Sequence, residues 1–264
     1  MALSATMISP STNCPLIYKR SFPAVGDGRR SFPVNMPNAP SFLVRAQAKR
    51  GAALFTKAET ASPVDLHFEA PLKIVEYPDP MLREKNKRID SFDEDLNKLV
   101  DEMFQLMYKT DGIGLSAPQV GINVQIMVFN PVGERGKGEE IVLINPRVYK
   151  YSRKTILFNE GCLSFPGIYA DVERPESVKI DALDINGARF TVNLSGLPAR
   201  VFQHEFDHLQ GILFFDRMTE DVLDSIRTEL QALEKKYEER TGLQSPEKIE
   251  TRKGRKVAVG FGKF

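Results

Sequence analysis

The chain has 264 residues, 42% of them hydrophobic, which is enough for one large or two small globular domains with a buried core. Its formal net charge is only +1, so the strong basicity of nucleic-acid-binding proteins is missing and no specific DNA binding is expected. No stretch of the sequence is apolar for long enough to suggest a membrane span, and two cysteines are too few for a disulfide framework.

The first fifty residues differ from the rest of the chain. They carry seven Lys or Arg, six Ser and six Pro but only one acid, Asp27, and they lack apolar periodicity. This composition is typical of an organellar transit peptide, with a plain disordered tail as the alternative, and the Met-Ala-Leu-Ser opening favours the plastid. We expect a disordered transit peptide over residues 1–56 and delivery to the chloroplast stroma, with the mitochondrion as a second destination.

The body of the chain is expected to span residues 57–244 and begins with a short strand-like run, Leu72–Val75. The capping box Ser91-Phe92-Asp93-Glu94 then predicts the start of a helix of roughly twenty residues, which ends before Asp111. The expected buried stripe of this helix consists of Leu96, Leu99, Val100, Met103 and Met107.

Two hairpins follow in the sequence. Val124–Phe129 and Ile141–Ile144 are strand-like and are joined by a glycine-rich loop, which predicts the first hairpin. In the second, Val178–Ile185 and Phe190–Leu194 alternate between apolar and polar residues around the turn Asn186-Gly187.

Two helices and a tail complete the predicted elements. Residues 197–210 form a helix with Pro198 in its first turn and Gly211 just past its end. A long amphipathic helix starts at Glu220, and its stripe from Leu223 to Tyr237 packs either on its own domain or on a second copy of the chain, as in a homodimer. Residues 245–264 are expected to be a basic, flexible tail. Strands followed by helices indicate the α+β class.

The sequence His204-Glu205-Phe206-Asp207-His208 predicts a metal site. Two of the three histidines in the chain lie at i and i+4, one helical turn apart on one face, where both imidazoles can reach one cation. A catalytic cation normally takes a third protein ligand, and the candidates are Cys162 and Glu229. Spacing does not choose between them, but the Gly- and Pro-rich surroundings of Cys162 favour the thiol.

The glycine loop Gly112–Ala117 formally matches the dinucleotide-binding fingerprint. It follows a predicted helix rather than a strand, and Pro118 comes immediately after it, so a Rossmann interpretation is rejected. Glycines there let the backbone approach a ligand closely, and they direct Gln119 into a pocket as an oxyanion partner.

The predicted metal site and oxyanion partner indicate a metal-dependent hydrolase, and three other functions compete with this interpretation. A thiol hydrolase would use Cys162 as nucleophile and would resist chelators, whereas a metalloendopeptidase with Glu229 as third ligand would cleave internal peptide bonds. A ribosome or RNA contact module would use the amphipathic helix and the basic residues 252–256.

Three separated segments of the sequence form a set. They are Gly112-Ile113-Gly114-Leu115-Ser116-Ala117-Pro118-Gln119, Glu160-Gly161-Cys162-Leu163-Ser164 and Gln203-His204-Glu205-Phe206-Asp207-His208. Together they resemble the signature motifs of peptide deformylases, and the similarity extends over about residues 70–218. Ser116 departs mildly from the pattern, since the family often has Ala there. The leader and the later helix resemble the plastid-targeted, bacterial-like subgroup.

The resemblance implies an enzyme that removes the formyl group from the N-terminal formyl-methionine of nascent organelle-encoded polypeptides, near the ribosomal exit tunnel, and releases formate. It implies an α+β fold in which antiparallel and mixed sheets wrap around the central helix that carries the histidine motif, followed by a long C-terminal amphipathic helix.

The resemblance also assigns roles to residues. Cys162, His204 and His208 would hold one divalent cation, Fe²⁺ or Zn²⁺, which decides for Cys162 over Glu229. Glu205 would handle protons, and Gln119 with the Leu163 backbone N–H would stabilise the oxyanion. The expected lining of the substrate pocket consists of Gly112, Ile113, Gly114, Phe165, Ile168 and Val201.

Overall fold

Seven strands form two antiparallel sheets in the computed structural model, which describes residues 59–251. The predicted transit peptide and residues 252–264 lie outside this range. The five-stranded sheet has the order β1 (Gly114–Ser116), β2 (Ile126–Phe129), β3 (Ile141–Tyr151), β6 (Ser177–Leu183) and β7 (Arg189–Ser195). The second sheet pairs β4 (Thr155–Cys162) with β5 (Phe165–Pro175).

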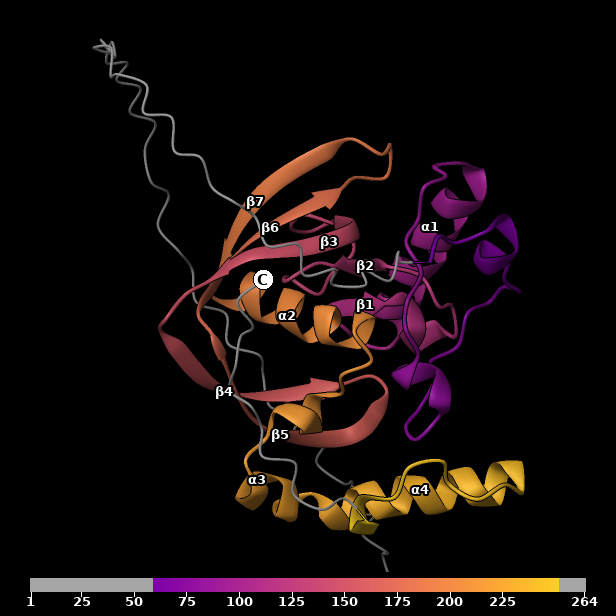
Figure 1. Cartoon of the computed structure of the whole chain (residues 1–264), viewed down its shortest axis with the longest axis vertical. Helices are drawn as coiled ribbons and strands as arrows, with labels where there is room; N and C mark the ends of the chain where they lie inside the picture. Colours follow the sequence, from indigo (N-terminus) through magenta and orange to yellow (C-terminus); the bar gives the residue numbers. More distant parts are fainter. Residues whose placement is uncertain (1–58, 252–264) are drawn as a thin grey trace, which may run out of the picture. The chain divides into compact units, whose positions relative to one another are not determined.

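Helix α2 (Leu197–Leu209) lies between the two sheets (Figure 1). It contacts β1, β2, β6 and β7 on one side and β5 on the other. Pro198 occupies its first turn, and Gly211, with a φ of 68°, follows its end, both as predicted. The N-cap is Gly196. The expected α+β fold, with sheets around a central helix, is confirmed.

Helix α1 (Glu94–Lys109) begins later than predicted. The Asp93 carboxylate, not Ser91, caps the helix, because it accepts hydrogen bonds from the backbone N–H groups of Asp95 and Leu96. The predicted apolar stripe is fully buried and packs against residues of β1 and β2. It therefore anchors the segment Gly112–Gln119 that follows the helix.

Both predicted hairpins are present. In the β6–β7 hairpin Val178 pairs with Leu194 and Ala182 with Phe190. In the β2–β3 hairpin Ile126 pairs with Ile144, but β3 runs on to Tyr151. Strand β3 contains Pro146, and its pairing with β6 is irregular between Ile144 and Arg147. A proline, which lacks a backbone N–H, is tolerated in a strand at such an irregular position.

Two expectations about elements are wrong, and one hairpin was not predicted. Leu72–Val75 is not a strand, although the Val75 N–H donates to the backbone carbonyl of Gln119 at 2.8 Å. The unpredicted hairpin is β4–β5, whose turn at Leu163-Ser164 directly follows Cys162. The long helix is broken at Ile226, whose ψ of 8° departs from the helical value, into α3 (Glu220–Ser225) and α4 (Arg227–Thr241).

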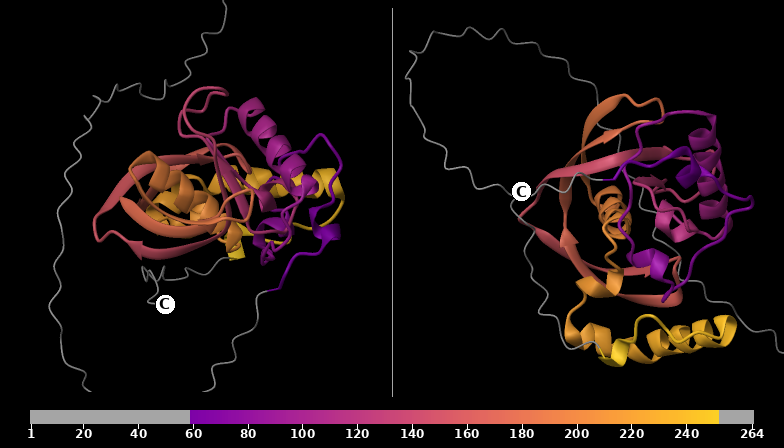
Figure 2. Two further views of the ribbon diagram at one scale, coloured as in Figure 1. Left: turned by 90° about the horizontal axis from the view of Figure 1, so that it is seen from above. Right: turned by 45° about the vertical axis from the view of Figure 1, so that its right-hand side comes forward.

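The C-terminal helices lie against the two-stranded sheet, on the side away from α2 (Figure 2). Leu223, Ile226, Leu230 and Leu233 pack in one cluster with Phe165 and Phe214, so the apolar stripe is covered by its own domain. The expected tail starts later than residue 245, because Ile249 is only 1% exposed within the same cluster.

Short 3-10 turns connect the larger elements: η1 (Pro63–Leu66), η2 (Pro80–Arg83), η3 (Ala117–Val120), η4 (Phe214–Arg217) and η5 (Ile249–Thr251). Within residues 59–251 no helix combines the length and apolar character that a membrane crossing requires.

Candidate metal centre

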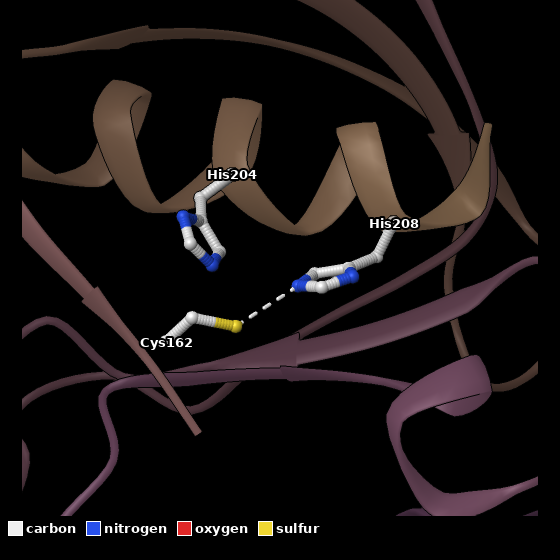
Figure 3. Close-up of side chains that lie close together, drawn as sticks. All are labelled: Cys162, His204 and His208. Carbon is white, nitrogen blue, oxygen red and sulfur yellow. Dashed lines mark hydrogen bonds between the residues drawn. The ribbon is translucent and has the colours of Figure 1, made fainter. Parts of the chain in front are cut away.

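Cys162, His204 and His208 converge on one point beneath α2. Their possible ligand atoms all lie within 4.8 Å of one another, and the Cys162 sulfur is 3.3 Å from His208 Nε2. Figure 3 shows both imidazole rings directed from the helix toward the sulfur. The i, i+4 spacing on α2 places the two ring centroids 5.2 Å apart.

The end of β4 sets the position of the thiol. The β4–β5 pairing is regular as far as Gly161 and Tyr169 and then shifts, so that Cys162 pairs with Phe165. A Cβ atom on Gly161 would lie 2.5 Å from the ring of Tyr169, so a larger residue there would displace this exposed ring. The shift in pairing after Gly161 therefore sets where Cys162 leaves the regular hairpin.

The donor set fits a divalent cation. One thiolate and two imidazoles supply three protein ligands, which is the number that a catalytic site uses while it keeps a position open. Glu229, the alternative third ligand, is exposed on α4 and is not part of the group. That alternative is therefore not favoured.

A buried carboxylate, that of Glu160, forms a hydrogen bond with the His204 ring on the side away from Cys162. Glu160 Oε2 lies 3.1 Å from His204 Nδ1, which leaves the other ring nitrogen for a cation. Arg174 donates two hydrogen bonds to Glu160, at 2.7 and 3.0 Å, and Arg200 donates one at 2.5 Å. Burial alone would raise the pKa of Glu160, but the charge of Arg174 and the bond to His204 hold it low, so the group is a carboxylate.

Arg174 extends this network along α2. Its guanidinium, only 4% exposed, also donates to Asp207 at 2.7 Å, and Asp207 accepts two further bonds from Arg217, at 2.6 and 3.1 Å. The charges are thus matched by several hydrogen bonds each, which is the condition under which buried ions are tolerated.

The electrostatics around the two histidines favour a cation. Burial and the nearby positive groups lower the pKa of His208, so that its imidazole is neutral, the form that binds a metal. Burial also works to lower the pKa of His204, but the negative charges of Cys162, Glu160 and Glu205 raise it well above the usual value. His204 therefore faces negative charge that a divalent cation would balance.

Glu205 is buried beside the centre. It is 3% exposed, and its Oε2 atom has no hydrogen-bond partner within residues 59–251. Burial raises the pKa of Glu205 to about 7, against the opposing effects of His204 and Ser116. A Cβ atom on Gly114 would lie 2.7 Å from Glu205 Oε1, so this glycine makes room for the carboxylate. A carboxyl with a pKa near neutrality is suited to proton transfer.

Gln119 and Leu163 flank the same point. Gln119 Nε2 is 3.5 Å from the Cys162 sulfur. The side-chain oxygen Oε1 of Gln119 accepts two hydrogen bonds from Ser116. Leu163 follows Cys162 directly, and its side chain closely approaches Gly112. The three motifs, far apart in the sequence, therefore meet at one site.

The predicted pocket residues fall in two groups. Ile113 packs in the cluster that contains Val201, which lies beside Gly114. Phe165 and Ile168 belong to a second cluster, against which Cys162 packs, and Phe165 is fully buried. Their role as the lining of a substrate pocket stays a prediction.

Sequence reasoning assigned no role to Glu160, Arg174, Arg200 or the Ser116 hydroxyl. Glu160 stands in one of the three motifs, two residues before Cys162, and an acid so close to a ligand is the signal that could have indicated a partner for histidine. For Arg174 and Arg200 no local pattern points to the site.

Comparison with known proteins places the chain in a family. The profile of the polypeptide deformylase family matches residues 71–223. Peptide deformylase 1B, chloroplastic, from Solanum lycopersicum is 69% identical over 233 residues, covering 88% of this chain and 84% of that protein. Peptide deformylase 1B, chloroplastic/mitochondrial, from Arabidopsis thaliana is 67% identical over 230 residues, covering 87% and 84%.

Solved structures agree. The crystal structure of Arabidopsis thaliana peptide deformylase 1B with an inhibitor has a TM-score of 0.67 and 73% identity, and the match covers 69% of this chain and all of that one. Peptide deformylase from Plasmodium falciparum has a TM-score of 0.62 and 45% identity, with coverage of 65% and 100%. The chain therefore belongs to the polypeptide deformylase family, and within it to the plant chloroplast type.

Proposed function

We propose that Cys162, His204 and His208 hold one divalent cation and that Glu205, Gln119 and the Leu163 backbone N–H act on the formyl group of the substrate. The chain is a deformylase, which removes the N-formyl group from nascent polypeptides. The observation that carries the residue roles is the convergence of one thiol and two imidazoles within 4.8 Å, with Glu205 buried beside them.

A cation held there would supply Lewis-acid activation of water and of the formyl oxygen. Glu205, whose carboxyl is buried beside the three ligands, accepts the proton of the attacking water and then returns it to the departing amine. Gln119 Nε2 and the Leu163 N–H donate hydrogen bonds to the oxygen that gains negative charge during the attack. Fe²⁺ and Zn²⁺ both suit a donor set of one thiolate and two imidazoles.

The substrate is an N-formyl-methionyl nascent peptide, and the apolar residues Ile113 and Val201 are suited to contact the methionine side chain. The relatives are named chloroplastic, which supports action in the stroma, and the name of the Arabidopsis thaliana relative adds the mitochondrion.

Residues 1–56 would then be the transit peptide and residues 57–244 the catalytic domain. Residues 245–251 would extend this domain at its C-terminal end. The basic residues 252–256 are the part of the chain suited to contact ribosomal RNA.

The central experiment measures bound metals in the purified protein and compares formate release from formyl-Met peptides with cleavage of unformylated peptides. We expect about one cation per chain and activity on the formylated peptide alone. A chelator should abolish activity, and added Fe²⁺ or Zn²⁺ should restore it. Chelator-resistant activity would instead favour Cys162 as a nucleophile.

Two variants separate the proposed roles. Glu205→Ala should keep its metal and lose turnover, because the proton carrier is gone while the ligands remain. Cys162→Ala should lose metal and activity together. Normal formate release by the Glu205→Ala protein would show that another group carries the proton.

A further inference from the structure

Ser116 contacts the proposed oxyanion donor with two groups at once. Its backbone N–H and its hydroxyl oxygen each lie 2.8 Å from Gln119 Oε1, and both donate to that carbonyl oxygen. The residue is the last of β1, is 0% exposed and immediately precedes the turn η3 that carries Gln119. The oxygen of the amide therefore has both of its acceptor positions filled.

The consequence for Gln119 is directional. A terminal amide rotates between two orientations that differ by exchange of its oxygen and nitrogen. With the oxygen held against Ser116, Nε2 faces the Cys162 sulfur at 3.5 Å, toward the proposed metal centre. In the reversed orientation Nε2 would face the Ser116 N–H, donor against donor.

The hydroxyl adds what the backbone N–H alone does not. A second donor restrains the position of the amide as well as its orientation, and it polarises the group so that its N–H becomes a stronger donor. An alanine at this position would keep the backbone bond and lose the second one. A donor to a developing negative charge is effective only if it is already held in place.

We infer that the Ser116 hydroxyl is a positioning group that fixes the Gln119 amide for hydrogen bonding to the oxygen of the reacting formyl group. This inference rests on the role proposed above for Gln119. In this inference Ser116 does not touch the substrate. Its hydroxyl also lies close enough to Glu205 to interact with that carboxyl, so the test has to separate an effect through Gln119 from an effect through Glu205.

The test is a double-mutant cycle with the full-length, metal-loaded protein. Ser116→Ala, Gln119→Ala and the double variant are assayed for formate release, with metal content and thermal unfolding measured on each. We expect Ser116→Ala to lower kcat about three- to tenfold, the value of one neutral hydrogen bond, with KM and metal content unchanged. In the Gln119→Ala background the same change should leave kcat unaltered.

A second readout needs no activity. In protein labelled with ¹⁵N-glutamine, the side-chain amide signal of Gln119 is identified by its loss in Gln119→Ala, and its relaxation reports how well the amide is ordered. We expect lower order in Ser116→Ala. Ser245→Ala is the matched control, because it removes another buried serine hydroxyl, one that bonds within the C-terminal segment. It should cost similar stability and leave both kcat and the Gln119 signal unchanged.

The outcomes separate this inference from the proposal on which it rests. If Gln119→Ala retains full kcat, the proposed role of Gln119 is wrong. If Gln119→Ala is impaired but Ser116→Ala keeps full kcat, or lowers kcat equally in both backgrounds, the Ser116 hydroxyl does not act through Gln119.

Discussion

Replacing Glu160 by glutamine tests whether the buried network holds the metal ligand. Glutamine has nearly the same shape and can still accept a hydrogen bond, so the change removes mainly the negative charge. That charge lies between Arg174 and Arg200, whose side chains are 4% and 9% exposed. The variant therefore leaves buried positive charge without its counter-ion and weakens the bond to His204 Nδ1.

The structure sets the size of both effects. Breaking a buried ion pair by removing one partner costs about 3–5 kcal/mol, and the lower end applies because Arg174 keeps Asp207 as a partner. Loss of the carboxylate that orients a metal-binding histidine typically lowers metal affinity about 10- to 100-fold. We expect a stability loss of about 3 kcal/mol in the metal-free protein and a separate loss of affinity.

Urea unfolding of the metal-free protein measures the first effect, and competition with a chelator for Zn²⁺ measures the second. The control is Glu176→Gln, which removes a solvent-exposed ion pair with Lys154 and should cost about 0–1 kcal/mol. If Glu160→Gln unfolds within 1 kcal/mol of the original protein and binds Zn²⁺ equally well, the network neither stabilises the fold nor orients His204.

Three further changes test other parts of the structure. Phe165→Ala should lower the free energy of unfolding by about 3–5 kcal/mol, since the ring stacks on Tyr77 at 5.0 Å in a fully buried cluster; a loss under 1 kcal/mol in urea would contradict that packing. Gly114→Ala should push the Glu205 carboxylate aside and lower kcat about tenfold or more with metal content unchanged; unaltered kcat would show that the carboxylate has room. Burial raises the pKa of Glu234, so the folded state binds its proton more tightly than the unfolded chain does. The resulting stabilisation is complete below the ordinary pKa of about 4.3 and is lost as the pH rises through the pKa of the folded state. Thermal unfolding at pH values on both sides of that range should show the stability of Glu234→Gln rising relative to that of the original protein as the pH rises; a stability difference that does not change with pH would refute the pKa shift.

Local patterns were sufficient for the elements that frame the site. The regular spacing of Leu96 to Met107 gave α1, and the Asn186-Gly187 turn between alternating residues gave the β6–β7 hairpin. Strand β4 has no such pattern, because its apolar residues Leu157 and Phe158 are adjacent and both exposed. Buried and exposed residues do alternate from Ile168 to Val172 in β5, but without a regular partner strand the hairpin was not predicted. The helix break at Ile226 could not be predicted, because no proline or glycine lies beside it in the sequence.

The residues of the site likewise fall into those that local patterns predicted and those that they did not. His204 and His208 are neighbours on one helical face, so their spacing alone indicated a shared ligand. The contacts that support them join residues far apart in the chain: Glu160 lies 44 residues from His204 and 14 from Arg174. Such pairs exist only after the two sheets have closed around α2, and no local pattern contains them.

Because the thiol comes from the two-stranded sheet and both imidazoles come from α2, a cation bound by all three would add a further cross-link between two parts of the fold that the buried ion pairs of Glu160 and Arg174 already join. The unfolded chain lacks this arrangement, so every increment of metal affinity becomes an increment of folding stability, about 4 kcal/mol when free metal exceeds its dissociation constant a thousandfold. The lifetime of the protein in the organelle would then depend on the local supply of its metal.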